Sequence, residues 1–383
     1  MSEPFALYVH VPWCRHVCPY CDFNVYARAE PPERDYTATL LAELSAHARD
    51  GTWQGRPAKS VYLGGGTPSL FSPGAIARVL DGVERLFGIV AGAEVTLEAN
   101  PGTVTGETLR GHRAAGVNRL SLGAQSFNPA HLRTLGRDHG ADDIATAVEA
   151  AARAGIANVS LDLIYATPGA TVDDWQRDLA AAIALAPAHV SAYCLTYEEG
   201  TPFHAWRASG RLRDVDEEVE AEMAEVAGAA LAAAGYARYE ISSWARPGFQ
   251  ARHNLSYWDG SDYLGVGAGA HSFAAAPAPG RRWSNERDPE RHRMRVAEAG
   301  TAIAREEQLT EHQARGEFMM TGLRQIAGVD LAAFRGRFAE DADRAFPHIV
   351  RLVGDGLLER AQQRLRLTES GLRFADDVAA SFL

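Results

Sequence analysis

Residues 5–24 read FALYVHVPWCRHVCPYCDFN, an apolar run followed at once by three clustered cysteines. The cysteines are Cys14, Cys18 and Cys21, spaced as CxxxCxxC. Three thiolates at this spacing can each bind one iron of a [4Fe–4S] cluster and leave the fourth iron without a protein ligand. A small molecule can coordinate such an open iron. The stretch therefore predicts a cluster-binding loop directly after a β-strand.

A zinc site is the structural alternative for these cysteines, with His16 or Cys194 as a fourth ligand. Zinc sites usually combine two separated pairs of Cys or His ligands, and no second pair follows here. We therefore favour the cluster. Cys194 is predicted to be a buried residue of the fold.

Short strand-like runs recur through the first two hundred residues, with helical patterns between them. The runs span 5–11, 60–64, 94–99, 118–124, 159–165 and 189–195. Strands that alternate with helices of 10–20 residues indicate βαβ units and a parallel sheet. Six such units favour an α/β fold, a partial (β/α)6 barrel. In such barrels the functional groups gather where the strands end.

The pattern changes after residue 243. A core is predicted over 1–243, a connecting segment with a Gly-rich stretch over 244–309, and a C-terminal domain over 310–383. The sequence GLLERAQQRLRLTESGLRFAD near the end has the pattern of a helix, a short hairpin and a further helix. It predicts a smaller, mostly helical, winged-helix-like domain.

Composition narrows the class of protein. The 383 residues include 38 basic and 49 acidic side chains, a formal net charge of −11, which argues against a broad nucleic-acid surface. The N-terminus lacks the pattern of a signal peptide, and no apolar run is long enough for a transmembrane helix. We expect a cytoplasmic protein with reduced thiols.

The motif YVHVPWCRHVCPYCDFN, followed by VYLGGGTPS and TLEANPG, resembles the radical S-adenosylmethionine (SAM) superfamily, and within it the branch of the oxygen-independent coproporphyrinogen III oxidases. In that superfamily SAM chelates the open iron, and an electron from the cluster cleaves its sulfonium bond. The resemblance implies a partial barrel, a [4Fe–4S] cluster on the three cysteines, SAM, and an electron donor for the cluster.

The same resemblance implies which residues contact SAM. Matching positions around the cluster-bound molecule are Tyr8, Gly65 and Glu98, with Ala270 near the adenosine. Those around a second SAM are Tyr20, Gly66, Thr67, Gln125, Arg137 and Asp162. A charged residue at a barrel strand is costly to bury unpaired, so the alternative for Arg137 and Asp162 is an ion pair that closes the barrel mouth. No catalytic residue is assigned.

Two features depart from the oxidase pattern. Phe23 stands where the oxidase has a fourth cysteine, and the oxidase's extension before the first strand is missing. Residues 253–258 read HNLSYW, which matches the HNxxYW motif of HemW-type haem chaperones. His253 offers an imidazole to a haem iron, and Tyr257 and Trp258 offer flat apolar faces to a porphyrin. The alternative is that the aromatic rings pack on the barrel and the histidine caps a helix.

The resemblance therefore predicts a haem chaperone that binds a [4Fe–4S] cluster, SAM and haem and passes haem to an acceptor protein of unknown identity. One alternative is oxidative decarboxylation of coproporphyrinogen III. Another is a winged-helix regulator that binds nucleic acid. The negative net charge disfavours this alternative, so no nucleic-acid partner is expected. Peripheral contact with a membrane stays open.

Overall fold

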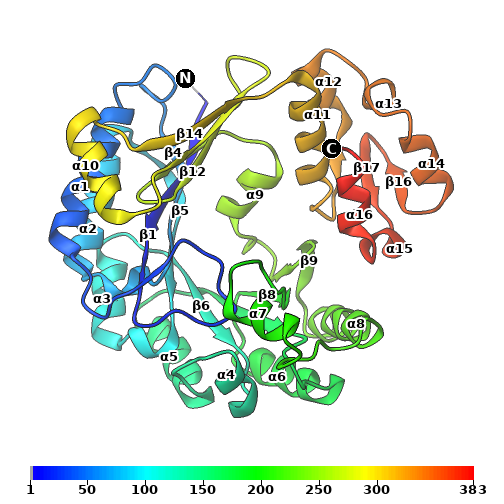
Figure 1. The fold of residues 1–383 in the computed structure, drawn as a ribbon, viewed down its shortest axis with the longest axis horizontal. Coiled ribbons are helices and arrows are strands. Elements are labelled where there is room, and N and C mark those ends of the chain that lie inside the picture. The colour runs from blue at the N-terminus through cyan, green and yellow to red at the C-terminus, as the bar shows by residue number, and fades with distance from the viewer. Residues whose placement is uncertain (1–2) are drawn as a thin grey trace.

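The computed structural model describes residues 3–383, and its largest element is a curved sheet of twelve strands. Figure 1 shows the sheet bending into an open ring with helices on its outer face. In sheet order the strands are β14 (Ile303–Gln308), β13 (Arg281–Asn285), β12 (His271–Ala274), β11 (Tyr263–Val266), β1 (Phe5–Val11), β4 (Ala58–Gly65), β5 (Ile89–Ala99), β6 (Arg119–Gln125), β7 (Asn158–Tyr165), β8 (His189–Cys194), β10 (Ser243–Ala245) and β9 (Ala237–Glu240).

The middle of this sheet is parallel, from β11 through β1 to β8. All six predicted strands are present, and they are linked by helices that lie side by side outside the sheet. These helices are α1 (Glu33–His47), α2 (Pro73–Leu86), α3 (Gly106–Ala114), α4 (Pro129–Thr134), α5 (Ala141–Arg153), α6 (Val172–Ala184) and α8 (Glu217–Ala233). The predicted partial barrel is confirmed.

The segment 244–309 contributes more to the sheet than its predicted role as a connection suggested. Strand β11 pairs in parallel with β1, and β12, β13 and β14 extend the sheet beyond it in antiparallel order. Strands from both sides of the predicted boundary at residue 244 therefore belong to one sheet. Since these strands are short, and β13 and β14 carry paired arginines and glutamates in place of an apolar run, sequence alone gives little sign of them. We propose the ranges 1–243, 244–309 and 310–383 as the core, the connecting segment and the C-terminal domain of the sequence.

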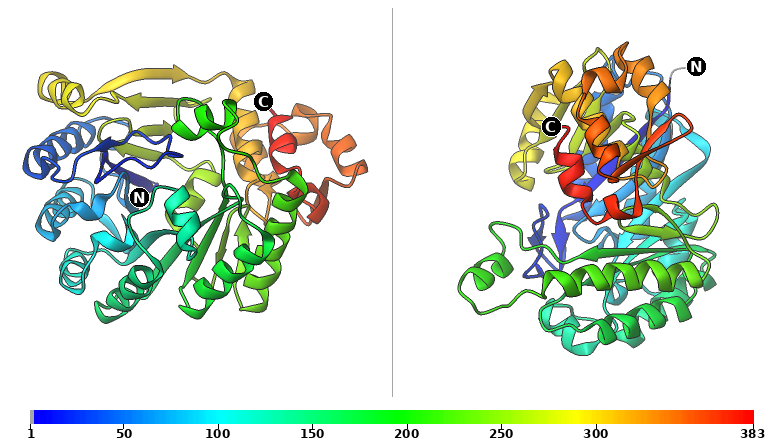
Figure 2. Two further views of the ribbon diagram at one scale, coloured as in Figure 1. Left: turned by 60° about the horizontal axis from the view of Figure 1, so that its bottom comes forward. Right: turned by 90° about the vertical axis from the view of Figure 1, so that its right-hand side faces the viewer.

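The C-terminal part has a separate hydrophobic core, which includes Phe334, Phe346 and Phe382. It is mostly helical around a small sheet and lies to one side of the ring (Figure 2). Its elements are α11 (Glu311–Gly322), β15 (Val329–Asp330), α12 (Leu331–Phe338), α13 (Ala342–Ala345), α14 (Ile349–Gly354), β16 (Leu358–Ala361), β17 (Arg364–Leu367), α15 (Glu369–Leu372) and α16 (Ala375–Ala380). The hairpin of β16 and β17 between helices agrees with the predicted winged-helix-like layout.

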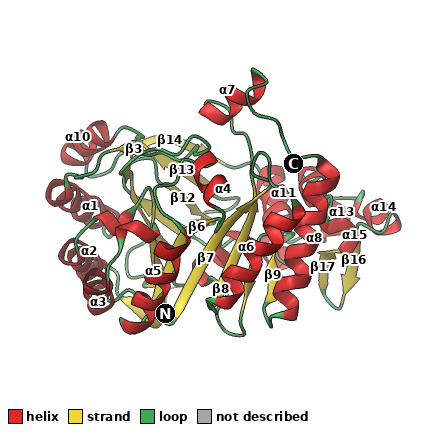
Figure 3. Ribbon diagram, turned by 90° about the horizontal axis from the view of Figure 1, so that it is seen from below, coloured by secondary structure: helices red, strands yellow, loops and turns green. Residues whose placement is uncertain are grey.

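Two short helices bear on the site. Helix α9 (Arg252–Trp258) lies inside the ring and packs on β4 and α11. Helix α7 (Pro202–Ala208) projects from the body beyond β8, as Figure 3 shows. The remaining elements are β2 (Trp13–Cys14), β3 (Tyr26–Ala27), α10 (Pro289–Ala299) and the 3-10 turns Pro68–Leu70 and Pro101–Thr103. No helix within the described residues has the length and apolar character to cross a membrane.

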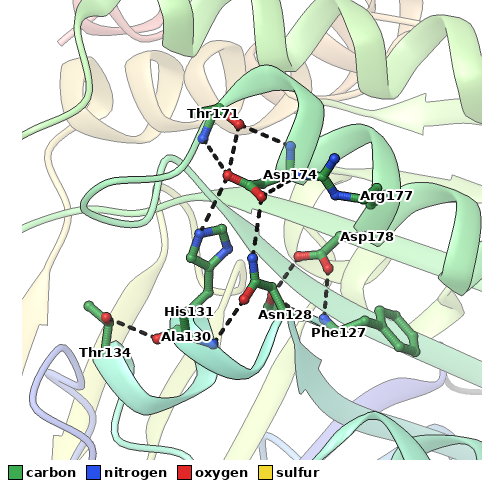
Figure 4. A network of polar contacts seen from close by, with 10 residues as sticks. Phe127, Asn128, Ala130, His131, Thr134, Thr171, Asp174, Arg177 and Asp178 are labelled. Carbon is green, nitrogen blue, oxygen red and sulfur yellow. Dashed lines mark hydrogen bonds and ion pairs between the residues drawn. The ribbon is translucent and has the colours of Figure 1, made fainter.

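A buried carboxylate on α6 fixes the turn that follows β6 (Figure 4). Asp178 accepts hydrogen bonds from Ser126 Oγ and from the backbone N–H of Phe127, at 2.8 Å for the latter. Asn128 then caps α4 by accepting from Ala130 N at 2.9 Å. The network holds the backbone directly after Gln125, one of the predicted SAM contacts.

Replacing Asp178 by alanine is expected to lower the free energy of unfolding by about 3 kcal/mol, because two buried donors lose their acceptor. Urea unfolding followed by circular dichroism measures this change. The matched control is Asp173→Ala, which removes an exposed carboxylate from the same helix. Equal stabilities for the two variants would contradict the assignment.

Candidate cofactor site at the carboxyl ends of the strands

Two cavities, of about 470 and 710 Å³, open where the parallel strands end. Of the predicted site residues, the first is lined by Cys14, Cys18, Cys21, Tyr20, Gly66, Gln125, Arg137 and Asp162, and the second by Tyr8, Tyr257 and Ala270. Gly65 and Glu98 line both cavities, together with Asp22 and Phe23. Positions far apart in the sequence therefore converge on one connected region.

The cysteine loop is fixed at both of its ends. It leaves β1, and the short strand β2 pairs in parallel with β3, which places Cys14 opposite Ala27. Within the loop, Cys21 N donates to Cys18 O at 3.1 Å. From outside, Phe203 N on α7 donates to Pro19 O at 3.0 Å. The loop is thus held in one shape by backbone contacts that do not involve the thiols.

Polar side chains from the barrel point at the thiols. Thr67 Oγ1 donates to Cys14 Sγ at 3.4 Å, and Arg137 Nη1 donates to Cys18 Sγ at 3.4 Å. Burial, together with a smaller effect of the neighbouring thiols, raises the pKa of Cys14 and raises that of Cys21 to about 11. The free thiols of Cys14 and Cys21 are therefore protonated at neutral pH, and binding of iron to them releases their protons.

The donor set fits a cluster. Within residues 3–383, no three His, Cys, Asp or Glu side chains are grouped closely enough to hold a single metal ion. A [4Fe–4S] cluster requires one thiolate at each of three irons, and soft thiolates are the ligands it selects. The fourth ligands considered for zinc have other partners: His16 Nε2 lies 2.8 Å from Gly136 O, and Cys194 lies beside Tyr165 and Glu220.

Glu98 on β5 is the carboxylate between the two cavities. Tyr62 OH donates to its Oε1 at 2.7 Å, and Gly65 N donates to its Oε2 at 3.0 Å. Burial raises the pKa of Glu98 to about 7, although these two hydrogen bonds lower it. A bound cation would favour the ionised carboxylate, because opposite charges stabilise each other in a desolvated site. Glu98 is therefore suited to hold an ammonium group.

Gly65 cannot be replaced without movement. Its φ is +107°, and a Cβ atom there would lie 2.3 Å from His10 Cε1. We expect Gly65→Ala to weaken SAM binding at least tenfold, since the strained backbone must shift by the Glu98 contact. Equilibrium dialysis of the reconstituted protein with SAM measures this. Gly102→Ala, where a Cβ meets nothing within 4 Å, should bind like the wild type; matching affinities for all three proteins would refute the expectation.

Arg137 and Asp162 do not form the ion pair considered from the sequence, so that alternative is wrong. Besides Cys18, Arg137 donates to Asn100 Oδ1 and to Gly123 O. Asp162 accepts from two serines, Ser121 Oγ at 2.8 Å and Ser160 Oγ at 3.1 Å. The physical reason is that Arg137 reaches the cysteine loop, while hydroxyls on β6 and β7 satisfy the carboxylate.

The other predicted SAM contacts differ in how far they reach the cavities. Gln125 lines the first cavity with a φ of +63°, an uncommon conformation for a residue that is not glycine. Gly66 allows close packing, because a Cβ there would lie 2.6 Å from Trp13 O. Thr67 is buried and lines neither cavity, since its hydroxyl is directed at Cys14.

The HNLSYW segment forms α9, and its histidine faces the barrel interior. His253 is 1% exposed; its Nδ1 lies 3.0 Å from Ser60 Oγ and its Nε2 lies 2.8 Å from Tyr257 OH. Trp258 packs under the guanidinium of Arg324, 4.6 Å from the ring centroid. Neither His253 nor Trp258 lines a cavity, whereas Tyr257 lines the second one.

Sequence reasoning missed several side chains that shape the site. Tyr62 and Asn100 contact Glu98 and Arg137 directly. Tyr62 could have been found from strand periodicity, because it lies on the same face as Gly64. Phe203 could not, since it lies on α7, far along the chain from the cysteine loop.

Three features together define a radical SAM protein: a parallel partial barrel, three cysteines after its first strand, and a glycine and a carboxylate beside them. The family model of the radical SAM superfamily matches residues 8–182, and that of the HemN C-terminal domain matches residues 309–374. The chain is similar to the haem chaperone HemW of Mycobacterium tuberculosis, with 39% identity over 100% of this chain and 95% of that protein. HemW of Escherichia coli is 37% identical over 99% of this chain and 98% of its own length.

This chain belongs to the HemW family of haem chaperones within the radical SAM superfamily. Among solved structures, coproporphyrinogen III oxidase (HemN) from E. coli superposes with a TM-score of 0.84, covering 99% of this chain and 90% of that chain. At 23% identity this likeness shows a shared fold. The resemblance predicted from the sequence is confirmed, and family membership implies a [4Fe–4S] cluster and SAM.

Proposed function

We propose that this protein binds a [4Fe–4S] cluster, SAM and one haem, and transfers the haem to an acceptor protein. The observation that carries the proposal is similarity over the full length, at 33–39% identity, to bacterial proteins named haem chaperone HemW. Phe23, in the place of the oxidase's fourth cysteine, supports it. Its side chain is 64% exposed and borders both cavities, so it offers an apolar surface to a ligand rather than a fourth thiolate.

In this proposal Cys14, Cys18 and Cys21 hold the cluster. Cluster and SAM together supply one-electron cleavage of the sulfonium bond. Glu98 accepts hydrogen bonds from the SAM ammonium group, while Gly65, Tyr8 and Ala270 shape the walls around the nucleoside. Arg137 places a positive charge beside Cys18 and so offsets part of the negative charge of the thiolates.

A second SAM is proposed beside the first, in the smaller cavity. This second molecule would contact five residues that line the smaller cavity, Tyr20, Gly66, Gln125, Arg137 and Asp162. Thr67, which lies behind them, would complete the set. The carboxylate of Asp162 and the amide of Gln125 give this end of the cavity groups that both accept and donate hydrogen bonds.

Haem is proposed to contact the HNLSYW region, with Tyr257 as the aromatic side chain that reaches a cavity. Trp258 can join it after a rearrangement of Arg324. Both ring nitrogens of His253 have hydrogen-bond partners, so ligation of the haem iron by His253 requires a change in its conformation.

The test is anaerobic reconstitution with iron and sulfide, followed by titration with haem while the Soret band is recorded. We expect saturation at one haem per chain, and subsequent transfer of that haem to apomyoglobin as a probe acceptor. The same sample is assayed with coproporphyrinogen III. Formation of protoporphyrinogen without a Soret change would replace the chaperone by the oxidase, the alternative function.

The proposal includes an electron donor for the cluster and an acceptor protein for haem, and no nucleic-acid partner. It places the protein in the cytoplasm, where reduced thiols are stable. Contact with a membrane surface would then be peripheral, at the stage of haem delivery.

A further inference from the structure

Three aromatic rings from three elements form a compact cluster next to Glu98, in which the centroids of Tyr8 and His253 are also only 6.4 Å apart. The ring of Tyr62 on β4 is centred 6.0 Å from Tyr8 on β1, at 29° between planes, and 5.0 Å from His253 on α9, at 33°. Gly64 leaves the space for this cluster, because a Cβ there would lie 2.7 Å from Tyr62 Cε1. The hydroxyl of Tyr62 then donates to Glu98 Oε1 at 2.7 Å.

Hydrogen bonds fix the position of His253 in this cluster. Ser60 and Tyr257 contact its two ring nitrogens, and its backbone N–H donates to Glu94 Oε1 at 3.0 Å. Burial lowers the pKa of His253 to about 3, so the ring is neutral at physiological pH. A neutral imidazole donates through one nitrogen and accepts through the other, and both roles are filled here.

We propose that His253 and Tyr62 are positioning residues for the SAM site: the histidine of HNLSYW braces Tyr62, and Tyr62 aims the carboxylate of Glu98. The inference rests on the proposed contact between Glu98 and SAM. It gives the histidine of the HNxxYW segment a role in SAM binding that does not require a bond to haem iron.

A second path joins the same cluster of rings to the cysteine loop. Tyr8 OH lies 3.0 Å from His10 Nδ1, and His10 Nε2 lies 2.9 Å from Asn24 O, three residues after Cys21. Helix α9 is thus connected through packed rings to Glu98 and, through Tyr8, to the loop that carries the cluster thiols. Displacement of His253 would remove the packing from one face of Tyr62.

The experiment measures SAM affinity for the anaerobically reconstituted full-length protein and three variants. Tyr62→Phe keeps the ring and removes the hydroxyl that contacts Glu98. His253→Phe keeps a ring against Tyr62 and removes both side-chain hydrogen bonds. The matched control is Tyr239→Phe, which removes another enclosed hydroxyl, one that contacts His189 Nε2 and Ala251 N but no residue of the SAM site.

We expect Tyr62→Phe to raise the Kd for SAM about tenfold, because a hydrogen bond to a charged carboxylate is lost. His253→Phe should raise it several-fold, because the packing of the imidazole against Tyr62 and its two side-chain hydrogen bonds are altered. Tyr239→Phe should bind SAM like the wild type. If His253→Phe fails to fold, Ser60→Ala replaces it, because this change removes the contact at His253 Nδ1 and keeps the imidazole; it should also raise the Kd for SAM.

The pH dependence of SAM binding separates positioning from a general loss of structure. The ionisable groups that face Glu98 are Tyr8, Cys14, Tyr62, Arg119, Asp162 and Tyr257. The Tyr62 hydroxyl lowers the pKa of Glu98, so its removal raises that pKa. Because the ionised carboxylate binds SAM, the affinity of Tyr62→Phe should begin to fall at a higher pH than that of the wild type as the pH is lowered. A merely loosened fold would lower the affinity at every pH alike.

Two outcomes would overturn the inference: Tyr62→Phe binding SAM like the wild type at every pH, or His253→Phe losing the Soret band while SAM affinity stays unchanged. The second result would make His253 a haem ligand. A wild-type protein that binds no SAM at all would instead refute the proposed cofactor site itself, so the two failures are distinguishable.

Discussion

Replacing Cys18 by serine is expected to abolish cluster loading and, with it, all cleavage of SAM. Cys18 lies in the middle of the cysteine loop, and its sulfur accepts from Arg137 Nη1 at 3.4 Å. A serine hydroxyl is nearly the same size, but iron–sulfur clusters select soft thiolates. Two remaining thiolates leave two irons without a protein ligand. Iron content per chain and absorption near 400 nm should fall to the background of the untreated protein.

The matched control is Cys194→Ser, which also replaces a sulfur atom by oxygen, at a residue that lines the same cavity. Cys194 lies beside Tyr165 and Glu220, and burial raises its pKa to about 12, so it is a neutral thiol. This variant should load iron and cleave SAM like the wild type. Full iron content in Cys18→Ser, or its loss in Cys194→Ser, would contradict the assignment of three ligands and one bystander.

The cluster loop and the strand-end residues could be predicted because their information is local. The CxxxCxxC spacing and the run before it lie within twenty residues, and a parallel strand places its last residues at the same edge of the sheet as its neighbours do. Glu98, Gln125 and Asp162 were therefore expected at one site, and all three line the first cavity.

The contacts between these residues could not be predicted, because they depend on which side chain reaches across the barrel. Arg137 and Asp162 looked complementary in charge, yet the arginine reaches Cys18 and the aspartate is satisfied by Ser121 and Ser160. The inward direction of His253 depends on how α9 enters the ring, which neither the motif nor its helical period fixes. Strand β11 was hidden for a related reason: its four residues pair with β1, more than 250 positions away in the sequence.

Phe203 gives the cysteine loop a support that is separate from the barrel core. Its side chain is fully buried in a small cluster with Leu135 and Leu195, and Tyr20 of the cysteine loop packs against that cluster. Its backbone N–H donates to Pro19 O. Leu135 lies two residues before Arg137, so the cluster touches both the loop and the segment that carries the arginine. Helix α7 thus anchors the cluster-binding loop through contacts outside the main barrel core.

Phe203→Ala is accordingly expected to act locally. Removing a buried phenyl ring costs about 3 kcal/mol, which raises the open population of this region about a hundredfold. The main core shares none of the buried residues of the small cluster, so the urea midpoint of the barrel should change little. Amide exchange over 195–216 should accelerate about a hundredfold, and the reconstituted cluster should bleach faster with a chelator. Phe374→Ala, at a phenylalanine that is 52% exposed, serves as the control and should change neither rate. An equal fall in the stability of the whole barrel, with no selective exchange in 195–216, would show that the loop depends on the main core instead.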